Sequence, residues 1–100
     1  MVKHIIIWTL KNNYSDKEKN EIKANIKSNL EGLLGKIDGL LAISVQIDRL
    51  ASSNADLMLD STFESKEALA AYATHPEHVA IANRDVKPFT EIRSCIDFEI

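Results

Sequence analysis

The order in which the hydrophobic period changes along this chain strongly limits its possible folds. Four segments alternate apolar and polar side chains, as half-buried strands do: residues 2–10, 40–50, 56–63 and 92–100. Between the first two lies a stretch with helical periodicity, and residues 66–74 form a shorter one. The order strand, helix, strand, strand, helix, strand predicts an α+β, ferredoxin-like βαββαβ fold, with a four-stranded antiparallel sheet and helices on one face.

The first helix has clear boundary signals. Ser15 and Glu18 form a capping box, which satisfies free amides at a helix N-terminus, so a helix is expected to begin here. Gly35 suits the left-handed residue just beyond the helix end. The expected apolar stripe comprises Ile22, Ile26, Leu30, Leu33 and Leu34.

A proline interrupts the second helical region. Ser65 is the expected N-cap of residues 66–74. His75 precedes a proline and is therefore pushed out of the α region, which ends that helix. Pro76 suits the first position of another short helix, expected to reach residue 83 or 84.

Size and composition predict one soluble domain covering residues 1–100. The net charge is −3, and the lysines are scattered, which disfavours nucleic-acid binding. The apolar run near the N-terminus is too short for a membrane span or a signal sequence, so we expect no membrane partner and a cytoplasmic location. Cys95 is the only cysteine and is interpreted as a small apolar strand residue.

The alternation leaves apolar side chains on both faces of the sheet. The face expected under the helices carries His4, Ile6, Trp8, Ile43, Val45, Leu59 and Ile96. The opposite face carries Ile5, Ile7, Ala42, Met58 and Cys95. A domain this small is not expected to leave that second patch in water, so a homodimer packed sheet to sheet is predicted.

Proton-transfer groups gather at the proline break. Tyr72 and His78 would lie about 120° apart on a continuous helix, but the break at Pro76 lets them converge. A histidine can remove a proton next to a carbonyl while a tyrosine stabilises the resulting oxyanion. The alternative is structural: Tyr72 is a core aromatic, and a backbone carbonyl satisfies His78.

The other two histidines have simpler interpretations. His75 is expected to be structural, capping the short helix or bonding a neighbouring loop. His4 is either a buried polar anchor or the rear wall of a pocket. The spacing of His75, Glu77 and His78 does not match a zinc motif, and no glycine-rich phosphate loop is present, so neither a metal nor a cofactor is expected.

Four pieces of the chain resemble the stress-responsive A/B barrel (Dabb) family. They are Val-Lys-His-Ile-Ile-Ile-Trp at residues 2–8, Thr-Phe-Glu-Ser at 62–65, His-Pro-Glu-His-Val at 75–79, and Asp-Phe at 97–98. The resemblance covers essentially the whole chain. It implies a homodimer in which two sheets form a central barrel, a dimeric α+β barrel.

The family includes a plant polyketide cyclase branch, with olivetolic acid cyclase as an example, and the resemblance extends distantly to it. It implies that Tyr72 and His78 act as a catalytic pair in an aldol-type ring closure, and that His4 lies at the pocket. Ile22, Ile26 and Trp8 depart from that branch, and the indole could fill the cavity. The expected pocket lining is His4, Ile6, Trp8, Ile22, Ile26, Leu59, Ile81 and Phe89.

Three functions follow as expectations. The first is a small-molecule pocket for an apolar or carbonyl-containing ligand, with cyclase-like or isomerase-like proton transfer. The second is a non-catalytic stress-response or interaction protein with a filled interior. The third is a monooxygenase of the wider dimeric α+β barrel group.

Overall fold

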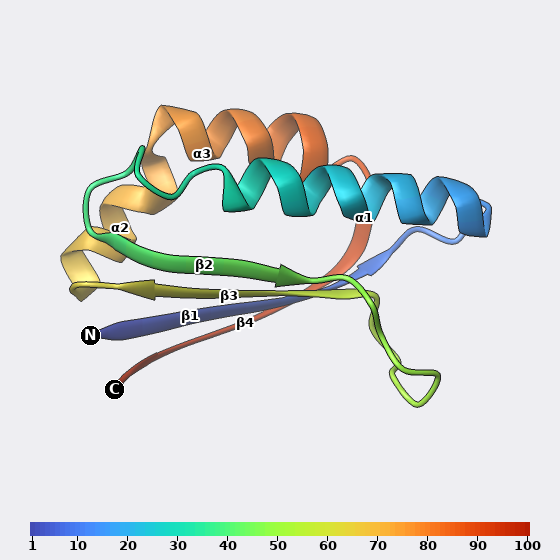
Figure 1. The fold of residues 1–100 in the computed structure, drawn as a ribbon, viewed down its shortest axis with the longest axis horizontal. Coiled ribbons are helices and arrows are strands. Elements are labelled where there is room, and N and C mark those ends of the chain that lie inside the picture. Colours follow the sequence, from blue (N-terminus) through green and yellow to red (C-terminus); the bar gives the residue numbers. More distant parts are fainter.

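The computed structural model describes residues 1–100 as one sheet with all helices on one side (Figure 1). The elements in chain order are β1 (Val2–Leu10), α1 (Asp16–Glu31), β2 (Leu40–Gln46), β3 (Leu57–Phe63), α2 (Lys66–Thr74), α3 (Pro76–Ile81), the π-helix η1 (Ala82–Val86) and β4 (Thr90–Glu99). The sheet order is β2-β3-β1-β4, and all neighbours are antiparallel. The predicted ferredoxin-like α+β fold is confirmed.

The core lies between the helices and the three strands β2, β3 and β1. Period-2 alternation places every second residue of β1 and β3 under the helices, where these side chains are buried. From above, α1 contributes the buried Ile26 and Leu30, and α2 contributes Tyr72. No helix packs on β4, whose residues are almost all exposed. Most side chains of β4 are therefore accessible for other contacts.

Two predicted boundaries near α1 and β2 were wrong. The helix ends at Glu31 with Gly32 as its cap. Beyond it, the chain forms tighter turns in which an amide donates to the carbonyl three residues earlier, as the amide of Leu33 does to the carbonyl of Leu30. The second strand ends at Gln46 and has a bulge between Leu40 and residue 42. That bulge interrupts the regular alternation and leaves Leu41 exposed.

A glycine locks the start of β2 against α2. Gly39 has a φ of +84°, and a Cβ built there would lie 2.5 Å from the Cβ of Ala68. Both the left-handed backbone and the missing side chain are therefore needed at this position. The close approach sets how α2 rests on the sheet.

The helical segment after Pro76 is longer than predicted. It passes from α3 into the π-helix η1 and ends at Val86, beyond the expected end at residue 83 or 84. The amide of Lys87 bonds the carbonyl of Ala82, five residues back, at 2.9 Å. This wider turn allows the helix to continue, and Pro88 follows it closely.

The face of the sheet away from the helices (the open face) carries exposed apolar side chains. Register places Ile96 opposite Ile5 and Phe98 opposite Lys3, so both β4 residues lie on the open face. Cys95 lies opposite Ile6, on the helix side. The sequence-based placement of Ile96 and Cys95 on the two faces was therefore wrong. Alternation divides the residues of an edge strand into two sets, but only the register with the neighbouring strand decides which set faces the helices.

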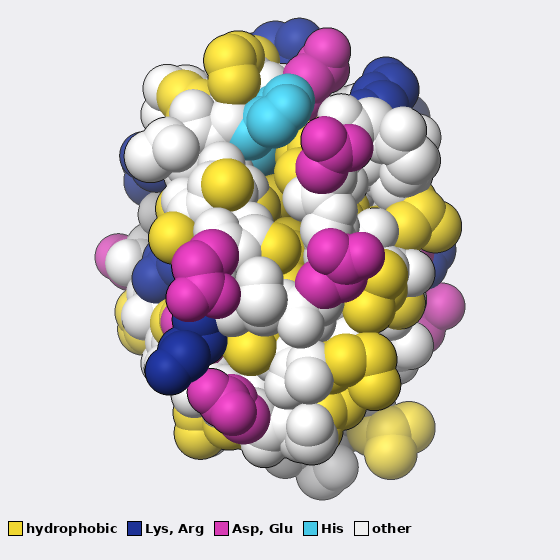
Figure 2. All heavy atoms as spheres, turned by 90° about the vertical axis from the view of Figure 1, so that its left-hand side faces the viewer, with side chains coloured by type: hydrophobic (Ala, Val, Ile, Leu, Met, Phe, Trp, Pro, Cys, Tyr) yellow, Lys and Arg dark blue, Asp and Glu magenta, His cyan; other side chains and the backbone are white.

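The open face remains strongly apolar after this correction. Ile7, Ile92, Ile96 and Phe98 are between 41% and 60% exposed. Figure 2 looks at the end where the termini lie and shows hydrophobic side chains at the surface on the lower side, away from the helices. None of the helices has the length and apolarity required to cross a membrane.

Candidate functional site

A cavity of about 450 Å³ lies between the helices and the sheet. Its floor comes from β1 and β3, and its walls come from α2, α3 and η1. The lining residues are Ile6, Trp8, Leu30, Leu59, Tyr72, Ala73, His78, Val79, Ala82, Asn83, Val86, Lys87, Thr90 and Arg93. Trp8 forms part of the floor, and the space beside it stays open.

The proline break brings Tyr72 and His78 together in this cavity. His75 has an extended conformation (φ −65°, ψ 131°), so α2 ends there and α3 starts in a new direction. The ring centroids of Tyr72 and His78 lie 4.1 Å apart with an interplanar angle of 32°. The break therefore brings the two rings together, as predicted from the sequence.

Both side chains carry a buried polar atom without a partner. The hydroxyl of Tyr72 and Nδ1 of His78 make no hydrogen bond. A buried polar group usually has a partner, because leaving it unpaired costs about 1–3 kcal/mol. Tyr72 and His78 both line the same cavity, so the unpaired atoms lie close to the space that a ligand would occupy.

Burial shifts the pKa of both groups. It raises the pKa of Tyr72 to about 12, so the phenol stays protonated and can donate. Burial also lowers the pKa of His78, and the positive charges of Lys87 and Arg93 act in the same direction. The backbone carbonyl of Ala73 raises the pKa of His78 and partly offsets this lowering. Even so, Nδ1 makes no hydrogen bond of normal geometry. The imidazole is therefore neutral at pH 7 and able to accept a proton.

The structure separates the residues expected to line the pocket into two groups. Ile6, Trp8 and Leu59 form its floor, and Tyr72 and His78 form part of its walls. Ile26 and Ile81 are core residues, and Ile22 and Phe89 pack against that core from outside the cavity wall. His4 also lies outside the wall, although its ring meets the edge of Tyr72 with centroids 6.2 Å apart.

His75 and His4 both make bonds that hold the fold. Nδ1 of His75 accepts a hydrogen bond from the amide of Glu77 at 3.1 Å, which caps α3, and Pro76 occupies the first turn. Nδ1 of His4 lies 2.5 Å from a carboxylate oxygen of Asp97 on β4. His4 is 7% exposed, so this contact anchors a buried ring to the edge strand.

Several cavity residues were not predicted from the sequence. Val79, Ala82 and Val86 recur at helical spacing after Pro76, and extending the expected helix by one turn would have placed them on its inner face. Lys87 and Arg93 bring positive charge to the cavity from the end of η1 and from β4.

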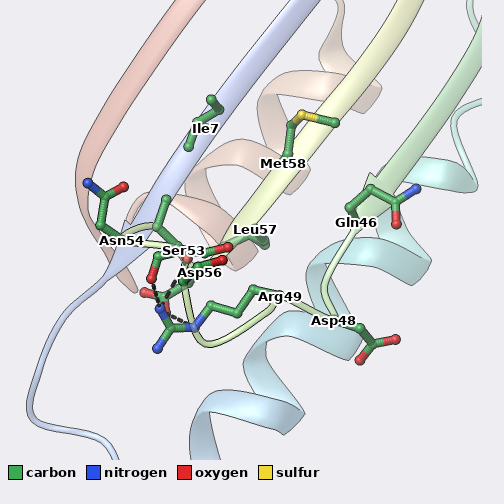
Figure 3. A pocket seen from close by; sticks show the side chains of 11 residues that line it. Ile7, Gln46, Asp48, Arg49, Ser53, Asn54, Asp56, Leu57 and Met58 are labelled. Carbon is green, nitrogen blue, oxygen red and sulfur yellow. Dashed lines mark hydrogen bonds and ion pairs between the residues drawn. The ribbon is translucent and has the colours of Figure 1, made fainter.

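A second cavity of about 430 Å³ lies beside the loop between β2 and β3 (Figure 3). The guanidinium of Arg49 donates to the carbonyl of Ser53 at 2.7 Å and lies 3.7 Å from Asp56. A carboxylate oxygen of Asp56 in turn accepts a hydrogen bond from the amide of Leu10 at 2.7 Å. These polar groups bond one another and hold the loop on the sheet.

Relatives of this chain are found in plants and bacteria. A stress-response A/B barrel domain-containing protein from Arabidopsis thaliana is 33% identical over 100 residues; the match covers 98% of this chain and 36% of the relative. This chain thus spans well under half of that relative's length.

Solved structures resemble the fold closely. A dimeric protein of unknown function with a ferredoxin-like fold from Bacteroides fragilis is 32% identical with a TM-score of 0.91, covering 99% of this chain and 95% of that one. A hydroxynitrile lyase from Passiflora edulis has a TM-score of 0.72 at 19% identity, covering 99% and 92%, and that likeness concerns the fold alone.

The family assignment follows from the match along the chain. The family model described as "Stress responsive A/B Barrel Domain" matches residues 2–100. The order of elements, the sheet topology and the proline break are all contained in that range. The chain belongs to the stress-responsive A/B barrel (Dabb) family.

Proposed function

We propose that this protein binds a small carbonyl-containing molecule in the 450 Å³ cavity and catalyses proton transfer on it. The observation that carries this proposal is a pair of buried, unbonded polar atoms, the Tyr72 hydroxyl and His78 Nδ1, on two residues that line a largely apolar cavity. A few polar groups converging in an apolar cavity of several hundred cubic ångströms are typical of ligand sites.

The two groups have complementary protonation states. Neutral His78 would remove a proton from the carbon next to the carbonyl, and protonated Tyr72 would donate to the oxygen that becomes negatively charged. Lys87 and Arg93 add positive charge at the cavity and would favour a ligand with an anionic end. Such a step underlies cyclase-like and isomerase-like reactions.

The first test asks whether the cavity holds a ligand. Protein purified without denaturation is expected to release a small molecule with a carbonyl group and an apolar body, detected by mass spectrometry. Ala82→Leu fills the cavity and should lose this molecule, whereas Ala80→Leu adds the same volume at an exposed position of α3 outside the cavity wall and should retain it.

The second test separates binding from chemistry. Exchange of the ligand's α-proton for deuterium, followed by NMR, should slow by about a hundredfold or more in His78→Asn. Unchanged exchange in that variant would remove His78 as the base. Equal ligand content in the Ala82 and Ala80 variants would instead favour the non-catalytic alternative.

We also propose that two copies associate through the open face. Exposed isoleucines of β1 and β4 form an apolar surface there, and no element of the same chain covers it. The similar Bacteroides fragilis structure is described as dimeric. A symmetric dimer would pack two such faces together and remove them from water.

A further inference from the structure

Three side chains with metal-binding atoms meet on the helix side of the β1–β4 pair. Asp97 lies directly opposite His4 in the strand register, and Cys95 precedes Asp97 by two residues. Since residues two apart share a face of a strand, both β4 side chains project beside the His4 ring. The pairing of β1 with β4 therefore assembles the group.

The ligand atoms of the three residues converge. Nδ1 of His4 lies 2.5 Å from Oδ1 of Asp97 and 3.8 Å from Sγ of Cys95, and Sγ lies 3.6 Å from the same Oδ1. All three atoms lie within 4.8 Å of one another. They surround a common point at the surface of β4.

A nucleophilic triad does not fit this arrangement. In such a triad the imidazole uses one nitrogen for the nucleophile and the other for the carboxylate, but here Cys95 and Asp97 approach the same nitrogen. Partial burial and the neighbouring carboxylate of Asp97 also raise the pKa of the Cys95 thiol, which is the reverse of what activates a cysteine.

Tetrahedral zinc coordination fits much better. Zinc bonds of about 2.0–2.3 Å at tetrahedral angles separate a nitrogen or oxygen from a sulfur by about 3.6 Å, and a nitrogen from an oxygen by about 3.3 Å. The two distances to sulfur already match. The carboxylate must move by about 0.8 Å from Nδ1, which the half-exposed side chain of Asp97 can do by rotation.

We propose that His4, Cys95 and Asp97 form a zinc-binding site with a fourth position open to solvent. Imidazole, thiolate and carboxylate are the ligand types that Zn²⁺ takes, and three protein ligands with one open position is a common arrangement. The proposal does not depend on the proposed function of the cavity.

The charges of the bound state balance. A neutral imidazole, a thiolate and a carboxylate carry two negative charges, which equal the charge of Zn²⁺. Binding displaces the thiol proton of Cys95 to solvent, and His4 binds through Nδ1 with its remaining proton on Nε2. The His4 ring is held in place because it is buried against the edges of Phe63 and Tyr72.

The sequence pattern did not reveal this group. The candidate ligands that it suggested, His75, Glu77 and His78, are close together along the chain, and no metal was expected. The ligands proposed here are separated by 91 and 93 residues. Only the antiparallel pairing of the first and last strands brings them together.

The test is a zinc titration of the full chain after removal of metals, in competition with a chromogenic chelator. The wild type should bind one Zn²⁺ per chain with micromolar or tighter affinity. Cys95→Ser and Asp97→Asn should each weaken binding by about tenfold or more, or about 1.4 kcal/mol. Glu99→Gln, on the same face of β4 but outside the group, is the matched control and should bind as the wild type does.

A second measurement identifies the ligand directly. Co²⁺ bound at the site should show a thiolate-to-metal charge-transfer band that disappears in Cys95→Ser. Both substitutions keep the size and polarity of a side chain on the exposed edge strand, so circular dichroism should show that the variants still fold. Affinity unchanged by both substitutions, absence of the thiolate band, or loss of binding only on substitution of His75 or His78 would each overturn the proposal.

Discussion

The two faces of this sheet both carry apolar side chains but differ in exposure. On the helix face, Leu59 and Phe63 are completely buried, and the remaining space beside them is a cavity whose wall carries two unbonded polar atoms. On the open face, Ile96 and Phe98 remain in contact with solvent. One face has its partner within the chain, while the other still requires one.

The largest effect is expected from a charge on the open face. Ile96→Asp should raise the dimer dissociation constant by about a thousandfold, because a symmetric interface loses the burial of two isoleucines at about 2 kcal/mol each. Analytical ultracentrifugation measures this constant. Glu99→Gln, on the other face of the same strand, is the control. A wild type that is monomeric at micromolar concentration would contradict the difference between the faces.

Truncation in β3 should distinguish the faces within one strand. Leu59→Ala should lower the free energy of unfolding by about 3 kcal/mol, since the side chain is fully buried under the helices. Met58→Ala changes the next side chain, which faces the open side, and should cost clearly less. Urea denaturation in the monomeric Ile96→Asp background makes the two values comparable; equal losses would remove the proposed asymmetry.

Removing an unbonded hydroxyl tests the cavity wall. Tyr72→Phe should raise the free energy of unfolding by about 1 kcal/mol, because the buried oxygen has no partner in the folded chain. The same variant should bind the cavity ligand less tightly. Urea denaturation and ligand content measure the two effects, and a destabilised variant would indicate that the hydroxyl is bonded in the folded protein.

Acid should reveal the burial of His78. His78 is buried next to Tyr72, and this burial lowers its pKa. The charges of His4, Lys87 and Arg93 lower it further. The unfolded chain therefore binds the proton more strongly than the folded chain does. The stability from neutral His78 is complete above about pH 6.5 and is lost as the pH falls toward the lowered value.

His78→Asn should therefore lose less stability than the wild type between pH 7 and about pH 5. Urea denaturation over this range measures the difference. Tyr72→Phe is the control, because a phenol does not titrate there. Superimposable profiles for the wild type and His78→Asn would show that the imidazole is equally solvated in both states.

The local signals in the sequence predicted much of the site. The capping box at Ser15, the cap at Ser65 and the break before Pro76 all depend on neighbouring residues, so each could be read directly. The convergence of Tyr72 and His78 followed from that break. The π-helix was not predicted, because no local residue pattern in Ala82–Val86 distinguishes its bonding from that of an α-helix.

The sequence by itself determined the order of the elements, the ferredoxin-like topology and the presence of an apolar surplus on the sheet, because these depend on local period and composition. Only the tertiary structure decided the size of the cavity, the face on which Ile96 and Cys95 lie, and the meeting of Cys95, His4 and Asp97. Those features depend on strand register and side-chain packing between distant segments, and neither is encoded in any short stretch of the chain.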